Sequence, residues 1–169
     1  MFDATAWLER NAPGYGQLPD EARNAITEFS LLWSLFESQI LNESASASAI
    51  IKKCEFLDAS GLLHERDFVD CLSYFQTRYS EYGTLGPRFE GLYLRKNDKR
   101  DLVAKVILGG EASVAEKLAA CLIVVYRYRN NYFHGIKWAY RFHDQLENFQ
   151  HSNRLLAYVM DSAWVYRDT

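Results

Sequence analysis

Apolar side chains recur at intervals of three and four residues through most of this 169-residue chain, and that period constrains the fold more than any other feature. It is clearest in "AITEFSLLWSLFESQIL", where Ile26, Phe29, Trp33 and Phe36 fall on one side of a helix. No stretch alternates apolar and polar residues as a half-buried strand does. The sequence therefore predicts an all-α protein, an antiparallel bundle of about five or six helices.

Glycine, proline and capping residues divide this pattern into segments. Residues 1–19 contain four such breaks, and we interpret them as an N-terminal extension to a helical domain of residues 20–169. Residues 84–110 are the least regular part, and there we expect one or two short helices around an exposed, charged loop. Helices are expected over residues 20–41, 64–83, 111–135 and 138–166, with a shorter helix from Ile50 to near Gly61.

Composition limits the compartment and the partners. A formal charge of −3 gives no overall attraction to nucleic acid, so a polyanion would need a local basic patch. Cys54, Cys71 and Cys121 are odd in number and fit no CxxC spacing, so we expect buried thiols rather than a disulfide framework. The first residues lack the pattern of a signal peptide, and no apolar run approaches a membrane span. We therefore expect a cytoplasmic protein with no membrane partner.

The segment of residues 111–135 carries the strongest helix signals. Ser113 is a candidate N-cap, Glu116 completes a capping box three residues later, and Gly135 is a candidate C-terminal stop. Its expected core face consists of Val114, Leu118, Cys121, Leu122 and Val125. The helix should therefore be buried along much of its length.

Polar residues crowd the end of this helix, in "YRYRNNYFHGIKW". Steps of three and four place Arg127, Asn130, Asn131 and His134 on a second face, and Arg129 projects from the seam between that face and the core. The polar cluster occupies the last turn and a half of an otherwise buried helix. Such an end is expected to open onto a groove or a partner.

This segment resembles the HEPN family, the higher eukaryote and prokaryote nucleotide-binding domains. The family motif is an arginine and a histidine separated by four to six residues, the first of which is usually polar; Arg129, Asn130 and His134 match it here, with four residues between the arginine and the histidine. Arg127 also satisfies the spacing, but its follower is Tyr128, so we prefer Arg129. The resemblance is closest at the motif and extends more loosely, through helix order, over residues 20–167.

The resemblance implies metal-independent cleavage of single-stranded RNA, without a cofactor, in a cleft where two copies of the motif meet across a homodimer. It also implies a toxin or a phage-defence effector, with Arg129 and His134 as catalytic residues. Histidine titrates near neutral pH and can act as base or acid, while a guanidinium matches phosphate geometry. Residues expected to support the site or contact RNA are Asn130, Arg127, Asn131, Lys137 and Arg141.

Two other interpretations of the motif stay open. A member of the family can keep the motif yet bind a nucleotide or a protein partner without cutting, and basic residues also cap helix ends in purely structural roles. Many HEPN toxins are silenced by a partner that modifies a tyrosine two residues after the histidine. That position is Ile136 here, so we do not expect this form of control, although an antitoxin or another regulatory protein remains a candidate partner.

The remaining candidates each have a structural alternative. Glu37 could orient the motif arginine from the first long helix, but we favour a solvent-facing charge. The run from Arg95 to Arg100 could track phosphates, but Asp98 and Asp101 favour a solvated loop. Four aromatic residues could stack on bases, yet such spacing favours the core or a dimer interface: Tyr126, Tyr128, Tyr132 and Trp138. We expect His64 at a helix start and His143 and His151 on the surface, with no metal site.

Overall fold

The computed structural model describes residues 1–133 and 144–164, and these form the predicted all-α fold. The α-helices in these ranges are α1 (Ala4–Asn11), α2 (Asp20–Ile40), α3 (Ala47–Ala59), α4 (Val69–Tyr79), α5 (Pro87–Glu90), α6 (Arg100–Ile107), α7 (Val114–Phe133) and α8 (Leu146–Trp164). Three single 3₁₀ turns join them: η1 (Tyr15–Gln17), η2 (Glu65–Asp67) and η3 (Lys96–Asp98). Among the described helices, none is both long enough and apolar enough to cross a membrane.

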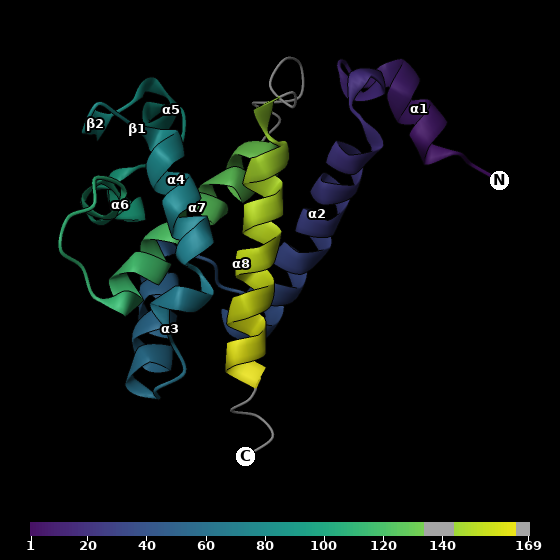
Figure 1. The fold of residues 1–169 in the computed structure, drawn as a ribbon. Coiled ribbons are helices and arrows are strands. Elements are labelled where there is room, and N and C mark those ends of the chain that lie inside the picture. Colours follow the sequence, from purple (N-terminus) through teal and green to yellow (C-terminus); the bar gives the residue numbers. More distant parts are fainter. Residues whose placement is uncertain (134–143, 165–169) are drawn as a thin grey trace.

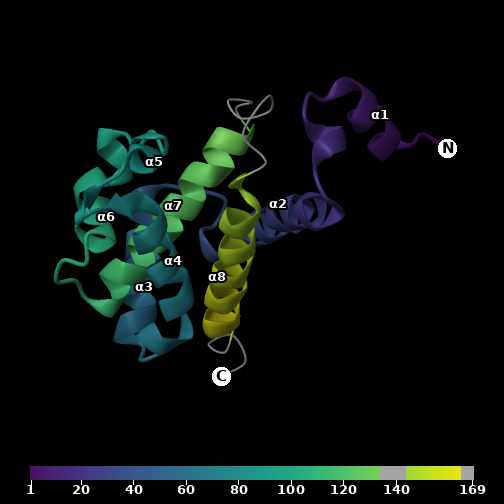
Figure 2. The same ribbon diagram turned by 45° about the horizontal axis from the view of Figure 1, so that its top comes forward.

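Helix α7 is the central element of the bundle. It packs along α3 and also contacts α4, α6 and α8, while α8 packs along α2 (Figures 1 and 2). Because neighbours surround α7, its apolar run from Leu118 to Val125 is buried on every side. Of the expected core face, only Val114, in the first turn, remains half-buried. The polar end of α7 therefore extends directly from the most enclosed part of the molecule.

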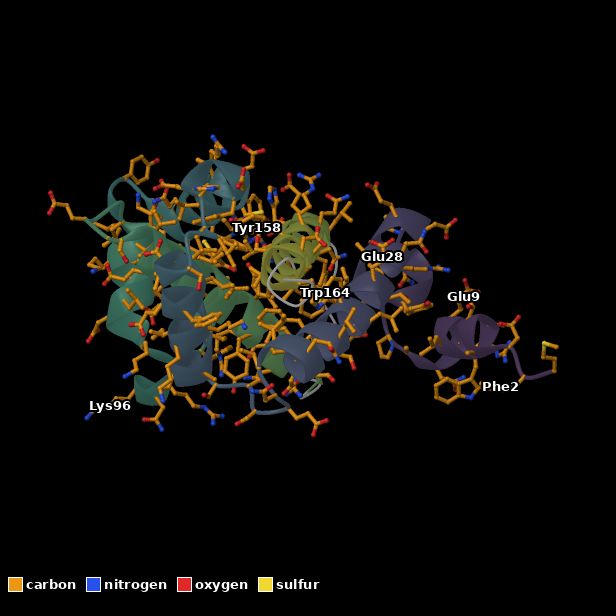
Figure 3. All side chains as sticks on the ribbon, turned by 90° about the horizontal axis from the view of Figure 1, so that it is seen from below. Phe2, Glu9, Glu28, Lys96, Tyr158 and Trp164 are labelled. Atoms are coloured by element: carbon orange, nitrogen blue, oxygen red, sulfur yellow. The ribbon has the colours of Figure 1, made fainter. Side chains whose placement is uncertain are left out.

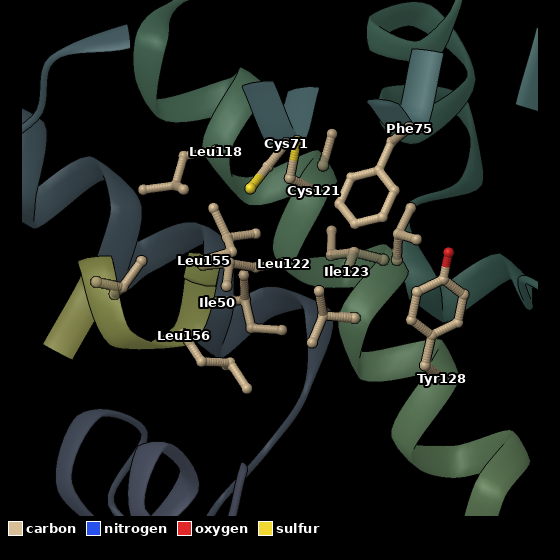
Figure 4. Packing of buried hydrophobic residues seen from close by; sticks show 14 of the residues in the cluster. Ile50, Cys71, Phe75, Leu118, Cys121, Leu122, Ile123, Tyr128, Leu155 and Leu156 are labelled. Atoms are coloured by element: carbon tan, nitrogen blue, oxygen red, sulfur yellow. The ribbon is translucent and has the colours of Figure 1, made fainter. Parts of the chain in front are cut away.

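The hydrophobic core gathers side chains from several helices. Figure 4 shows Ile50 of α3, Phe75 of α4, Leu122 of α7 and Leu156 of α8 converging. The three cysteines are free and buried, which confirms their prediction as core residues. Burial raises the pKa of all three thiols, that of Cys71 to about 11.

The capping signals on α7 are confirmed at its N-terminus. The Ser113 backbone N–H donates to Glu116 Oε2 at 2.8 Å, and the Glu116 N–H donates to Ser113 Oγ at 3.1 Å. This reciprocal pair is the predicted capping box. The predicted stop at Gly135 lies outside the described residues, as does the start of the last helix at Trp138.

A short hairpin replaces the end of the helix predicted over residues 64–83. Helix α4 stops at Tyr79, and β1 (Ser80–Glu81) pairs antiparallel with β2 (Thr84–Leu85). Tyr82 and Gly83 form the turn with φ of 52° and 78°, and two positive φ angles are what a type I′ turn requires. Strands of two residues are too short to produce an alternating pattern, so no periodicity predicted them.

The predicted N-terminal extension contains α1 and η1. In Figures 1 and 2, α1 lies beyond the start of α2, away from α3 to α7. One ion pair ties it to the bundle, with Arg23 Nη1 2.9 Å from Glu9 Oε1, and the Arg23 guanidinium lies over the Tyr15 ring at 4.9 Å. This part of the chain is thus anchored through Arg23 of α2 and through Leu18, which is buried in the core.

Candidate functional site

The polar end of α7 lines a pocket of about 540 Å³. Four of the seven predicted site residues contribute to it, namely Arg127, Arg129, Asn130 and Asn131. The other three, His134, Lys137 and Arg141, lie outside the described residues. The structure therefore brings the motif arginine and its polar follower to the wall of one pocket.

Two further elements complete the pocket wall. Ser46 and Ala47 come from the start of α3, and Arg95, Asn97 and Asp98 come from the turn at η3. Arg95, Arg127 and Arg129 line the pocket; Asp98 pairs with Arg127 and Glu37 pairs with Arg129, so Arg95 leaves an excess of positive charge. The N-terminal end of the α3 dipole adds to that potential. The pocket is therefore electrostatically suited to an anion such as a phosphate.

Arg129 is oriented from both sides. Its Nη1 donates to Asn130 Oδ1 at 3.1 Å, and its Nη2 donates to Glu37 Oε2 at 3.4 Å. The same carboxylate oxygen accepts a 2.8 Å hydrogen bond from Trp33 Nε1. Because Trp33 is buried, it fixes the position of the Glu37 side chain. Our interpretation of Glu37 as a solvent-facing charge is therefore wrong, and Glu37 spans from α2 to the motif arginine.

Arg127 and Asn131 are buried against the loop between α5 and α6. Arg127 Nε donates to the Leu92 carbonyl at 3.1 Å, and Asn131 Nδ2 donates to the same oxygen at 3.4 Å. These residues are 5% and 2% exposed, respectively. They reach the pocket wall, but their polar groups are already engaged by protein. The helical spacing of Arg127 and Asn131 correctly predicted that they share one face of α7. It could not show that a loop covers this face.

The loop that covers them is not solvated throughout. Asp98 is buried, with Oδ2 3.2 Å from Arg127 Nη1 and 2.8 Å from the Arg95 backbone N–H. The interpretation of the Arg95 to Arg100 run as a solvated loop is therefore wrong at Asp98, because the guanidinium of Arg127 compensates its charge. Arg95 itself is exposed and lines the pocket. Asp98, an acidic residue three positions after Arg95, is the sequence feature from which a capped turn could have been predicted.

The aromatic residues of α7 have different environments. Tyr128 is buried, and its hydroxyl hydrogen-bonds with that of Tyr79 and donates to Asn148 Oδ1 at 2.9 Å. Burial raises its pKa well above the ordinary value. Tyr132 meets the Phe149 ring edge-on at 6.2 Å, whereas Tyr126 stacks on Trp33 at 5.9 Å and lines the pocket. The core role is thus confirmed for Tyr128, and Trp138 lies outside the described residues.

The histidines within the described residues do not form a site. His64 is exposed at the start of η2, as expected. His151 is half-buried and stacks on Tyr74 with ring centroids 4.1 Å apart, so its prediction as a surface residue is wrong. His143 falls outside the described residues. In the parts of the chain that the structure describes, no three His, Cys, Asp or Glu side chains are grouped as metal ligands.

Comparisons with known proteins assign no family to the chain, since no protein-family model, no curated protein and no solved structure matches it. Its functional interpretation therefore rests on the pocket beside α7 and on the residues that line it.

Proposed function

We propose that this protein is a HEPN-like, metal-independent endoribonuclease that cleaves single-stranded RNA, with Arg129 and His134 as catalytic residues. One observation carries the proposal: the motif arginine, held by Glu37, lines a positively charged pocket. A volume of about 540 Å³ lies within the range of small-ligand sites and can take a nucleotide unit. RNA supplies both the negative charge and the unit size that this pocket favours.

The residue types fit cleavage by the neighbouring 2′-hydroxyl. A base removes the proton of that hydroxyl, its oxygen attacks phosphorus, and the bond to the 5′-oxygen breaks as an acid protonates the leaving oxygen. Arg129 stabilises the negative charge that builds on the phosphate oxygens. His134 supplies one of the two proton transfers, since imidazole titrates near neutral pH. The second transfer needs another group, which a second copy of the chain would provide in a homodimer.

The exposure of the two candidate arginines favours Arg129 as the phosphate-binding one. The Arg127 side chain is 7% exposed and its guanidinium is paired with buried Asp98. The Arg129 side chain is 31% exposed, and its distance of 3.4 Å to Glu37 is longer than a tight charged hydrogen bond. Arg129 can therefore shift its guanidinium towards a phosphate at less cost than Arg127.

A second function, a non-catalytic module that binds a nucleotide or a regulatory protein, uses the same pocket. The observation that favours it is the pocket charge itself, because an excess of arginines binds phosphate whether or not a bond is cut. A role as a toxin or phage-defence effector, with an antitoxin or regulatory protein as partner, follows from the family resemblance. This toxin or defence role is part of the endoribonuclease proposal and not of the second function.

The chemistry of the products tests the proposal. Single-stranded RNA incubated with the protein in EDTA should yield fragments ending in 2′,3′-cyclic phosphate. DNA of the same sequence should stay intact, because it lacks the attacking hydroxyl. RNA that is bound and not cut would support the second function, and cleavage only after addition of a divalent metal would contradict the mechanism. Mass measurement in solution checks the composite site, since a fully active monomer would contradict it.

A further inference from the structure

A second pocket lies beside the first and shares a wall with it. Its volume is about 500 Å³, and Arg95, Arg127 and Asn131 line both hollows. Tyr93 and Arg100 line the second pocket but not the first. The shared wall therefore consists of Arg127 and Asn131 of α7 and of Arg95, which lies in the loop from Leu92 to Asp98 that joins α5 to α6. Figure 3 shows Lys96 of this loop at the edge of the molecule, at the opposite end from Phe2.

This loop is fastened to α7 at both ends. At its start, the buried Leu92 carbonyl accepts hydrogen bonds from Arg127 and Asn131. At its end, the carboxylate of Asp98 accepts from Arg127 and from the Arg95 backbone. The same buried guanidinium thus holds both anchors. The loop is therefore positioned before any ligand arrives, which lowers the entropic cost of binding one.

Between the anchors, the loop turns Tyr93 and Arg95 outward. The Tyr93 side chain is 53% exposed although the residue is a large aromatic, and its backbone is left-handed with φ of 52°. A non-glycine residue adopts that conformation only at an energetic cost. The contacts of the two flanking anchors with α7 offset this cost. Arg95 is exposed, and among the described residues it forms no ion pair with a carboxylate, whereas Arg100 pairs with Glu90 at 2.6 Å.

We propose that this loop binds the nucleotide next to the cleaved bond, with Tyr93 stacked on an unpaired base and Arg95 on the phosphate between the two pockets. Arg127 and Asn131 are then positioning residues that act through the Leu92 carbonyl. This inference rests on the proposed function for its ligand class.

Single-stranded RNA is the ligand that these features fit best. Adjacent hollows with an excess of positive charge suit consecutive nucleotides, and an exposed aromatic ring beside an arginine is the arrangement by which single strands are bound without base pairing. A duplex would bury its bases away from Tyr93. An unmodified protein partner would present no phosphate to Arg95.

Binding of an uncleavable RNA tests the inference independently of catalysis. The probe is a fluorescein-labelled oligouridylate with 2′-O-methyl groups, and its anisotropy is measured with the full chain in EDTA at several salt concentrations. Tyr93→Ala should weaken binding roughly tenfold, as expected for loss of one stacked base. Arg95→Ala should also weaken binding and should lower the slope of log affinity against log salt by about 0.7, the value for one phosphate contact on a single strand.

Matched controls come from the same chain. Tyr82→Ala removes an exposed tyrosine that has the same φ of 52°, and Arg66→Ala removes an arginine whose side chain is 80% exposed; neither residue lines the two pockets. Wild-type binding by both controls, with losses for Tyr93→Ala and Arg95→Ala at unchanged thermal unfolding, would support the inference. Equal affinity for all variants, equal losses in the controls, or no RNA binding at all would overturn it. Binding that depends on the loop without cleavage of unmodified RNA would refute only the proposed endoribonuclease activity.

Discussion

Arg127 and Asp98 form a buried ion pair, with Nη1 3.2 Å from Oδ2, that joins the central helix α7 to the turn before α6. The sequence places Arg127 beside the motif and Asp98 in a charged run, and in the structure each compensates the buried charge of the other. The pair fixes one wall of the pocket. It therefore links the stability of the fold to the shape of the candidate site.

Asp98→Asn should destabilise the protein by about 3 kcal/mol, because it leaves the buried guanidinium of Arg127 without a compensating charge. The free energy of unfolding from urea titration measures the effect. Asp101→Asn is the matched control on the same segment, and since Asp101 is exposed its effect should stay within about 0.5 kcal/mol. Equal stability of the two variants would show that the buried pair is not important for the fold.

Glu37→Gln should lower the rate of RNA cleavage at saturating substrate by roughly tenfold, because Arg129 loses the carboxylate that orients it. RNA affinity should stay the same or rise, since a negative charge near the pocket is removed. This opposite response of rate and affinity distinguishes positioning from general damage. Asp20→Asn, an exposed charge on the same helix, serves as the control. A loss of affinity without a loss of rate would contradict this role for Glu37.

Stability should fall as pH drops through about 6.5, owing to His151. Burial lowers the pKa of its imidazole in the folded protein, and nearby Arg154 acts in the same direction, against Glu147 and Asp70. Below the ordinary pKa of 6.5 the unfolded chain binds a proton that the folded chain resists, so acid favours unfolding until the lower folded pKa is passed. Urea midpoints measured across this range should decrease for the wild type.

His151→Gln should reduce that pH dependence, whereas His64→Gln should keep it, because His64 is exposed at η2. An identical pH profile for wild type and His151→Gln would assign the effect to other groups. The stacked Tyr74 ring, 4.1 Å from the imidazole, accounts for much of the local burial.

Local signals predicted the helical framework well. The period of apolar residues placed α2, α7 and α8, and the Ser113 and Glu116 pair marked the start of α7, because helix formation and capping depend on neighbours within one turn. The motif likewise placed Arg129 and Asn130 on a polar helix end, and in the structure both line the pocket. These features all arise within single helices.

The features that the sequence did not predict depend on contacts between distant segments. The burial of Arg127 and Asn131 requires the Leu92 carbonyl, and the orientation of Arg129 requires Glu37 from another helix. No helical phase encodes such partners. The sequence allows the run from Arg95 to Arg100 as a phosphate contact but favours a solvated loop, because the burial of Asp98 against Arg127 is a contact between distant segments.

Cleavage of single-stranded RNA in EDTA by three proteins, the wild type, Arg129→Ala and His134→Ala, tests the central claim most directly. General acid–base catalysis contributes ~10²–10⁴-fold, so His134→Ala should lose most activity, and Arg129→Ala should lose activity because the phosphate charge is no longer stabilised. Circular dichroism and mass in solution establish that the variants fold and assemble like the wild type. Fragments from the wild type alone are the predicted result. Equal fragments from all three proteins would contradict the assignment of Arg129 and His134 as catalytic residues.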